Sequence, residues 1–380
     1  MSTLASKLYP YGYYKVGAEI FDHKISALLR ATETHTRPTW HFHDDVYNGL
    51  NWEEDLPISL PQIYQQRAKQ LREKYDYITI SFSGGSDSWT VVNAFISSNT
   101  YIDEIFVRWP VAGTQKHQVN ATDTSAGNIL SEWELAIVPS LKKIRDLIPD
   151  TKITIHDWSN EILTSEVTDK DWMLTQDFLN VASFLKFQSI GKGEQQAIDK
   201  GLKTAIVFGI DKPQLWAKDG NIYCYFLDKL VNTHAYGENR VSELFYWTPD
   251  FPEITLVQSR LLFKYIKDNP AVADLIDRNK LYNPETKAIW NSVARSIIYQ
   301  EYSQLGLWQS EKPTSNIMCE NDAWINPLEN EKYLQSWKYG LSNVISSISS
   351  EYFEYRHGNV DNFGGFISGT YYLGNINRQD

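Results

Sequence analysis

Residues 83–88 read Ser-Gly-Gly-Ser-Asp-Ser and carry the residue types that bind phosphate. Two consecutive glycines let a backbone approach phosphate oxygens with no Cβ in the way. The serine hydroxyls are further donors, and a helix that starts here adds backbone N–H groups and the positive end of its dipole. The carboxylate of Asp87 repels an anion, so we expect it to bind a cation or to lie away from the phosphate. The chemistry expected of this segment is binding of a nucleotide phosphate together with a cation.

The elements around this segment place it at a strand-to-helix turn. Residues 75–82 are rich in β-branched and aromatic residues over the length of a strand, and residues 89–96 are apolar enough for a buried helix. Strands that alternate with helices pair in parallel, which predicts an α/β fold with a doubly wound, mostly parallel sheet and ligands at the carboxyl ends of its strands. Further strands of this pattern are expected at residues 102–109, 152–156 and 204–209, and further helices at 62–74, 131–147 and 172–187.

The patterns divide the chain into three expected parts. Asp219 and Gly220 predict a hairpin turn after the last of these strands, and the helical period at residues 256–267 and 333–352 predicts helices beyond it. The parts are an N-terminal aromatic-rich segment at residues 1–58, a nucleotide-binding α/β domain at 59–215, and a hairpin with a mainly helical region that completes the substrate site at 216–380.

Composition excludes several classes of protein. Hydrophobic residues are 42% and charged residues 22% of the chain, a globular balance that excludes extended disorder, collagen and coiled coil. The formal charge of −11 argues against general electrostatic capture of nucleic acid. Cys224 and Cys319 are too few for a disulfide framework or a four-thiolate zinc site. No apolar stretch is long enough to cross a membrane, so we expect a cytoplasmic protein without a membrane partner.

Three common motifs do not fit residues 83–88. The Walker motif needs a lysine, the dinucleotide fingerprint needs the spacing Gly-x-Gly-x-x-Gly, and the nucleophile elbow needs a glycine where Ser88 stands. The arrangement of a strand, the pattern SGGxDS and a helix instead resembles the pyrophosphate loop of the PP-loop (N-type ATP pyrophosphatase) superfamily, and in particular the synthetase domain of asparagine synthetase. The resemblance covers residues 60–215 and implies the HUP-like fold of the adenine nucleotide alpha-hydrolases.

The resemblance implies a reaction at the α-phosphate of ATP. A substrate oxygen, which we expect to belong to a carboxylate, would attack the phosphorus of the α-phosphate. AMP would be transferred to that oxygen and pyrophosphate would leave. Amide formation with an amine would follow. The loop amides and Mg²⁺ would stabilise the charge on the departing pyrophosphate. The ATP ligands that the resemblance implies are Ser81, Ser83, Gly84, Gly85, Ser86, Asp87, Ser88, Val107 and Gly209, with Asp87 also a catalytic residue and a ligand of Mg²⁺.

A second candidate segment follows the last expected strand, where residues 209–213 read Gly-Ile-Asp-Lys-Pro. Functional groups of a doubly wound sheet lie at such strand ends. Asp211 could bind Mg²⁺ and Lys212 could neutralise phosphate charge, whereas the structural alternative is a turn closed by Pro213. Lys312 is a further catalytic candidate, because related amide-forming enzymes bring a lysine to the α-phosphate from the C-terminal region. A surface loop is its alternative.

Other residues carry weaker signals. Glu132 and Glu134 stand at the start of an expected helix, where carboxylates are favoured by the dipole alone. His41 and His43 alternate on a strand-like segment and so would share a face, but no third metal ligand is placed beside them. Residues 191–193 read Gly-Lys-Gly, which fits a basic loop near phosphate or a simple turn, and we favour the turn.

Absences narrow the choice within the superfamily. Its sulfur-transferring and reducing members depend on cysteine pairs or cysteine-rich sites, which two distant cysteines do not supply. The chain begins Met-Ser rather than with the nucleophilic cysteine of a glutaminase domain, so we expect an amine that arrives free or from a partner amidotransferase. Two alternatives stay open: an enzyme that modifies nucleic acid or a nucleobase and stacks a base on its aromatics, and a non-catalytic protein that binds ATP or AMP.

Overall fold

The computed structural model describes residues 8–111, 129–164, 174, 189–231, 239–279, 283–299, 330–356 and 358–378. The helix expected at 172–187 falls almost wholly outside these residues, and so does Lys312.

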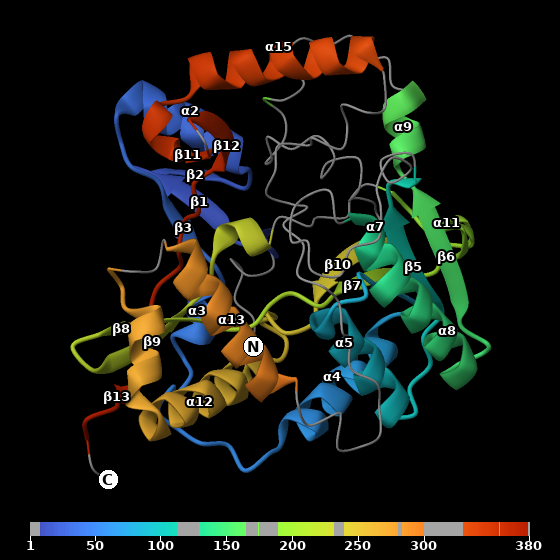
Figure 1. Ribbon diagram of the computed structural model, residues 1–380, viewed down its shortest axis with the longest axis horizontal. Coiled ribbons are helices and arrows are strands. Elements are labelled where there is room, and N and C mark those ends of the chain that lie inside the picture. Colours follow the sequence, from blue (N-terminus) through green and yellow to red (C-terminus); the bar gives the residue numbers. More distant parts are fainter. Residues whose placement is uncertain are drawn as a thin grey trace.

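A parallel sheet forms the centre of the described α/β part (Figure 1). Among the described residues it has five strands in the order β10-β7-β4-β5-β6, all of them parallel. This confirms the α/β class, the parallel sheet and the four strands expected from the sequence. The strands are β4 (Tyr77–Ser81), β5 (Glu104–Trp109), β6 (Lys152–Asp157), β7 (Thr204–Phe208) and β10 (Arg240–Leu244).

The strand order reverses beside β4. Its sequence neighbour β5 pairs with one edge, and β7, which comes after β6 in the chain, pairs with the other. A doubly wound sheet binds its ligands at such a switch point, outside the carboxyl ends of the strands. The turn that leaves β4 is the segment at residues 83–88, so the fold places the phosphate-binding candidate at this switch point.

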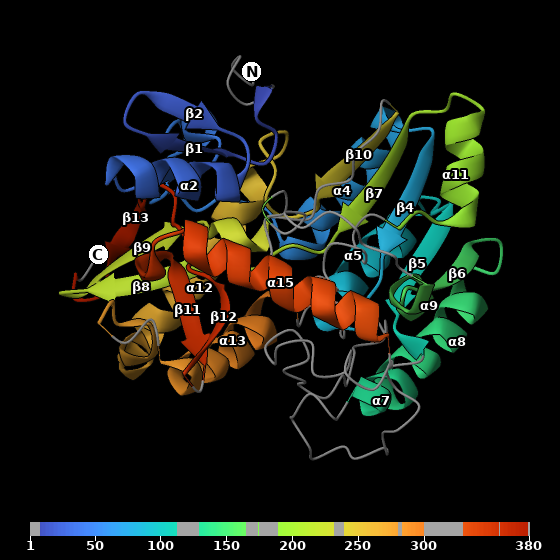
Figure 2. The ribbon, with the colours of Figure 1, turned by 90° about the horizontal axis from the view of Figure 1, so that it is seen from above.

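Helices cover both faces of the sheet (Figure 2). Helices α4 (Leu60–Lys74) and α5 (Ser86–Ser97) pack on one side of β4 and on each other, and α11 (Lys192–Asp199) lies across β4 and β7 on the other side. Helix α4 begins with a capping box in which Ser59 and Gln62 bond reciprocally. The helix expected at 131–147 is a continuous run of α7 (Ile129–Glu132), the π-helix η2 (Trp133–Ile137) and α8 (Val138–Leu147).

The sheet face beneath α11 is unusually polar. The buried carboxylate of Glu104 accepts from the Tyr77 hydroxyl at 3.0 Å and from the Glu194 backbone N–H at 2.8 Å. A Cβ on Gly191 or on Gly193 would lie within 2.7 Å of this carboxylate, so the two glycines let α11 sit down on it. Residues 191–193 therefore form the turn into a helix, as expected, and they serve its packing.

Three smaller sheets lie together on one side of the central one (Figure 1). The hairpin between β8 and β9 turns at Asp219 and Gly220, both with positive φ, as the sequence predicts. The C-terminal region contains helices, but its tail forms strands that the sequence did not reveal. The sheets have the orders β2-β1-β3, β13-β9-β8 and β11-β12, built from β1 (Tyr13–Val16), β2 (Glu19–Phe21), β3 (Thr39–His41), β8 (Gln214–Lys218), β9 (Asn221–Tyr225), β11 (Phe353–Arg356), β12 (Asn359–Phe363) and β13 (Tyr371–Asn375).

Helices complete the described chain, and they include those expected near 256–267 and 333–352. None of the described helices is both long and apolar enough to cross a membrane. The α-helices are α2 (Lys24–Thr34), α3 (Asp44–Tyr47), α9 (Ser159–Thr164), α12 (Glu253–Asp268), α13 (Pro284–Ile298) and α15 (Glu331–Ser347), and the 3-10 helices are η4 (Asp228–Leu230), η5 (Pro270–Ile276) and η8 (Ser350–Tyr352).

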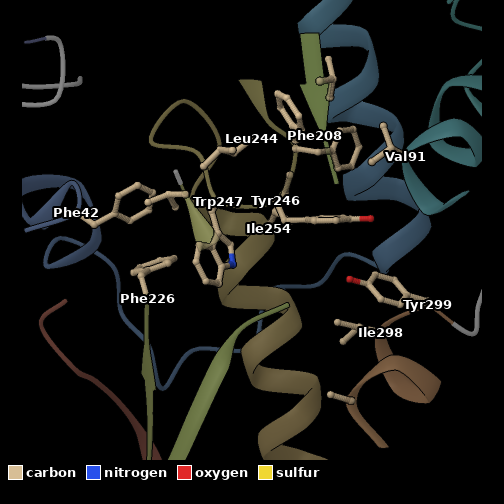
Figure 3. Packing of buried hydrophobic residues seen from close by; sticks show 14 of the residues in the cluster. Phe42, Val91, Phe208, Phe226, Leu244, Tyr246, Trp247, Ile254, Ile298 and Tyr299 are labelled. Atoms are coloured by element: carbon tan, nitrogen blue, oxygen red, sulfur yellow. The ribbon is translucent and has the colours of Figure 1, made fainter. Parts of the chain in front are cut away.

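Aromatic side chains join the N-terminal segment to the rest of the core (Figure 3). The ring of Phe42 lies 4.9 Å from that of Phe226, which meets Trp247 edge to face at 5.0 Å. These three rings come from residues far apart in the sequence and are all buried. Burial of large rings is the main use that the described structure makes of the high aromatic content.

Candidate functional site

Gly84 and Gly85 stand in the turn between β4 and α5. Gly84 has φ +74°, and a Cβ there would lie 3.0 Å from Cγ1 of Ile137 in the π-helix η2. Gly85 is the N-cap of α5 and offers no side chain to accept from the first N–H groups of the helix. Those N–H groups have no partner one turn earlier in the helix, because the helix begins there. The start of α5 is therefore suited to an anion.

The serines of the turn divide into two roles. Ser88 is buried, donates from its hydroxyl to the Gly85 carbonyl at 3.0 Å and accepts from the Ser83 N–H at 3.3 Å. It therefore fixes the shape of the turn from inside. Ser83 is exposed and Ser86 is half-buried at the first position of α5. Ser83 and Ser86 are thus the more exposed serines of the segment.

Two tyrosines hold Asp87 at the start of α5, and both direct their hydroxyls toward that helix in Figure 3. The hydroxyl of Tyr246 donates to the Asp87 backbone carbonyl at 2.9 Å, and the hydroxyl of Tyr299 donates to the carboxylate oxygen Oδ1. Burial, and then the charge of Asp87, raise the pKa of Tyr299 well above its ordinary value, so its hydroxyl keeps its proton and donates. Neither tyrosine belongs to a motif, so sequence reasoning missed both.

The segment after β7 meets the same turn. Lys212 is nearly buried, and its Nζ lies 3.0 Å from Oδ1 of Asp211. Burial lowers the pKa of the Lys212 ammonium, but the carboxylates of Asp211 and Asp87 outweigh burial and leave that pKa above its ordinary value. Asp87 is thus close enough to act on Lys212. The structure brings together the two predicted segments, residues 83–88 and 209–213.

Helix α13 adds a cation that sequence reasoning missed. Arg295 is exposed on its last turn and opposes the charge of Lys212. A basic residue in the last turn of a helix is ordinary, because it complements the helix dipole. That ordinary pattern is the only sequence signal for Arg295, and it does not point to a site.

Arg108 is a second missed residue, and it lies beside Ser81 at the end of β4. Its Nη1 donates to Ser81 Oγ at 2.9 Å, and its guanidinium lies over the ring of Phe106 at 4.6 Å. Burial lowers the pKa of Arg108 to about 9, which leaves the side chain charged at neutral pH. Val107, the neighbouring residue, is completely buried in β5, so a bound adenine would have to meet its backbone rather than its side chain.

The weaker candidates have mixed outcomes. Glu132 is buried in α7 and Glu134 is exposed in η2, the π-helix that packs on Gly84. The expectation that His41 and His43 share a strand face is wrong. His43 lies beyond the end of β3, with φ 49°, and precedes α3. The chain turns at this residue, and the ring nitrogen Nε2 of His43 lies 3.1 Å from the Pro10 carbonyl oxygen.

His41 instead pairs locally, with its Nδ1 2.6 Å from Oδ2 of Asp44. Within the described part of the chain, no group of three or more His, Cys, Asp or Glu side chains is arranged to hold a metal ion by itself.

Comparisons with protein-family models, with curated proteins and with solved structures found no match to this chain. The resemblance to the PP-loop superfamily therefore rests on residues 83–88 and their setting.

Proposed function

We propose that this protein binds ATP at residues 83–88 and transfers AMP from it to an oxygen of a carboxylate substrate, with release of pyrophosphate. One observation carries the proposal: the SGGxDS segment joins the central strand β4 to α5 at the switch point of a parallel sheet. The helix start there has a glycine cap and a dipole that favours an anion. The proposal includes a HUP-like fold that is similar to the synthetase domain of asparagine synthetase.

The residues divide the work as follows. The first N–H groups of α5 and the hydroxyls of Ser83 and Ser86 bind phosphate oxygens. Asp87 and Asp211 offer carboxylate oxygens, which are the ligands that Mg²⁺ prefers. Mg²⁺ is commonly held by one or two carboxylates together with substrate phosphates. When bound, Mg²⁺ would neutralise the charge that develops on pyrophosphate. Lys212, which both carboxylates influence, balances their charge and stabilises the same developing charge.

The second half of the reaction consumes the acyl adenylate. An amine attacks the acyl carbon, a C–N bond forms, the C–O bond to AMP breaks, and the amine loses a proton. The amine arrives free or from a partner amidotransferase. Arg295 on α13 offers an exposed cation near Lys212, which would attract an acidic substrate or the departing phosphates.

A second candidate function is nucleotide binding without turnover. The observation that favours it is that both carboxylates already have partners, since Asp87 accepts from Tyr299 and Asp211 accepts from Lys212. Such a protein would bind and release ATP or AMP as a signal or a structural ligand. It differs from the first proposal only in what happens to the bound nucleotide.

The test uses ATP labelled at the α-phosphate, Mg²⁺, and a panel of carboxylates and amines. The proposal predicts labelled AMP and free pyrophosphate, with at least a hundredfold loss in Asp87→Ala and no loss in Asp146→Ala, an exposed residue on α8. Labelled ADP with inorganic phosphate would contradict it. Tight ATP binding with no product across the panel would support the second candidate instead.

A further inference from the structure

We propose that Tyr299 is a positioning residue for Asp87: its hydroxyl holds one carboxylate oxygen so that the other is presented to the cation that accompanies ATP. This inference rests on the proposed function, because it needs a nucleotide at residues 83–88. It assigns a role to a residue of the C-terminal region that no motif identifies. It also gives a reason for the contact between the end of α13 and the turn at residues 83–88.

The geometry divides the carboxylate of Asp87 between two tasks. Tyr299 follows α13 directly, and its hydroxyl donates to Oδ1. A carboxylate has two oxygens and about four acceptor sites, so one donor leaves Oδ2 for a metal ion. A neutral donor orients the group without cancelling its charge, whereas a lysine or arginine in this place would neutralise it. Tyrosine is therefore a suitable partner for a carboxylate that must bind a cation.

Both ends of this contact are fixed by other bonds. The Tyr64 hydroxyl donates to the Ile298 carbonyl at 3.3 Å, and Gln258 Nε2 donates to Tyr64 Oη at 2.7 Å, which ties the end of α13 to α4 and α12. The Tyr246 hydroxyl holds the backbone carbonyl of Asp87 at 2.9 Å. Tyr299 itself is buried. The carboxylate is thus held through its main chain and its side chain by separate elements.

General experience with metal sites gives the size of the effect. Groups that hydrogen-bond a ligating carboxylate orient it, and their loss typically weakens metal affinity by about 10- to 100-fold. A role in packing alone would instead lower the stability of the whole protein and leave the affinity of the folded site for a cation nearly unchanged. The cation affinity therefore separates the two roles.

The experiment measures binding of Mn²⁺, from the electron paramagnetic resonance signal of the free ion, in the presence of α,β-methylene-ATP. The variant is Tyr299→Phe. The matched control is Tyr371→Phe, which removes a buried hydroxyl from a tyrosine on β13 whose ring packs on Trp52 and Phe226. Binding of the analogue without metal is measured in parallel. We expect Tyr299→Phe to weaken Mn²⁺ binding about 10-fold, to leave metal-free binding of the analogue unchanged, and to differ clearly from Tyr371→Phe.

A double-mutant cycle with Asp87→Asn shows whether Tyr299 acts through Asp87. In that background Tyr299→Phe is expected to have no further effect on Mn²⁺ binding. Should Tyr299→Phe not fold, 4-fluorophenylalanine placed at position 299 fills the space of the hydroxyl without donating, and the same loss is expected. Unchanged Mn²⁺ affinity, or an equal loss in Tyr371→Phe, overturns the inference and leaves the proposed function standing. Wild-type protein that binds no analogue overturns both.

Discussion

The backbone of Gly209, one residue past β7, lies against the backbone of Asp87 at the start of α5. A Cβ placed on Gly209 would come within 2.9 Å of both the carbonyl carbon and the carbonyl oxygen of Asp87. This contact joins the two strand ends that flank the switch point. The turn at residues 83–88, which we call the phosphate turn after its proposed ligand, is thus supported by the chain segment that also carries Asp211 and Lys212.

Replacing Gly209 by alanine is expected to disturb the turn directly. The added methyl group meets backbone, which cannot rotate away, so we expect a loss of ~1–3 kcal/mol in the free energy of unfolding and at least a tenfold weaker affinity for ATP. Urea unfolding and calorimetric titration measure the two effects. Gly369→Ala is the control, because a Cβ there meets only the Tyr371 hydroxyl at 3.9 Å. Wild-type ATP affinity in Gly209→Ala would show that the turn does not depend on this contact.

Removing the ammonium of Lys212 is expected to leave the carboxylates of Asp211 and Asp87 without the cation on which both act. Lys212→Met should lower the free energy of unfolding by ~1–3 kcal/mol and weaken ATP binding. Asp211→Asn in the same chain should recover part of the lost stability, because the remaining repulsion is then smaller. The control is Lys218→Met, at an exposed position on β8. Equal stability of the single and double variants would contradict the coupling.

His43 is expected to make the protein acid-sensitive below pH 6.5. Burial lowers the pKa of this imidazole from 6.5 to about 4. The unfolded chain therefore takes up a proton at a higher pH than the folded one, and stability falls as the pH drops from about 6.5 to about 4. The loss amounts to ~3 kcal/mol at ~1.4 kcal/mol per pH unit.

Urea unfolding at several pH values between 7 and 4 measures this slope. His43→Gln should flatten it, because the glutamine at position 43 does not titrate. The control His35→Asn alters an exposed histidine and should keep the wild-type slope. A wild-type slope in His43→Gln would assign the acid sensitivity to another group.

Glu243 is expected to give a second loss of stability at lower pH. Burial raises the pKa of this carboxyl, but Arg67 and Lys74 outweigh burial and bring it down to about 2. Its stabilising contribution is complete above about pH 4.5 and is lost as the pH falls toward 2. Glu243→Gln removes the negative charge that compensates the fully buried Arg67 at 2.7 Å, which should lower the free energy of unfolding by ~3–5 kcal/mol at neutral pH. Glu73→Gln, on the exposed face of α4, is the control.

The sequence predicted those parts of the fold whose signals are local. The strands at β4 to β7 are runs of β-branched and aromatic residues, and the phosphate turn is a run of glycine and serine. The strand β10 was missed because it reads Arg-Val-Ser-Glu-Leu, with three polar residues in five. Arg240 pairs with Glu194 and Glu243 pairs with Arg67, and these distant partners make the strand stable where its own pattern does not.

The same reason limits what could be predicted of the site. Gly84 and Asp87 follow from their own motif, whereas Tyr246 and Tyr299 are two of 23 tyrosines and have no local mark. Their importance comes from hydrogen bonds to Asp87, which exist only after the chain has folded. Arg108 is similar, because an arginine on a buried strand gives no hint that it will lie beside Ser81.

The hydrogen bonds from Tyr246 and Tyr299 to Asp87 span 159 and 212 residues of sequence. A chain that grows from its N-terminus therefore exposes the phosphate turn long before either tyrosine is made. At ~5–20 residues per second, the interval before Tyr299 is on the order of 10–40 seconds. A nascent chain on the ribosome would have the glycines and serines of the turn but an unanchored Asp87. If Asp87 binds the cation of ATP as proposed, a chain cut short before residue 299 is expected to bind that cation more weakly than the full chain.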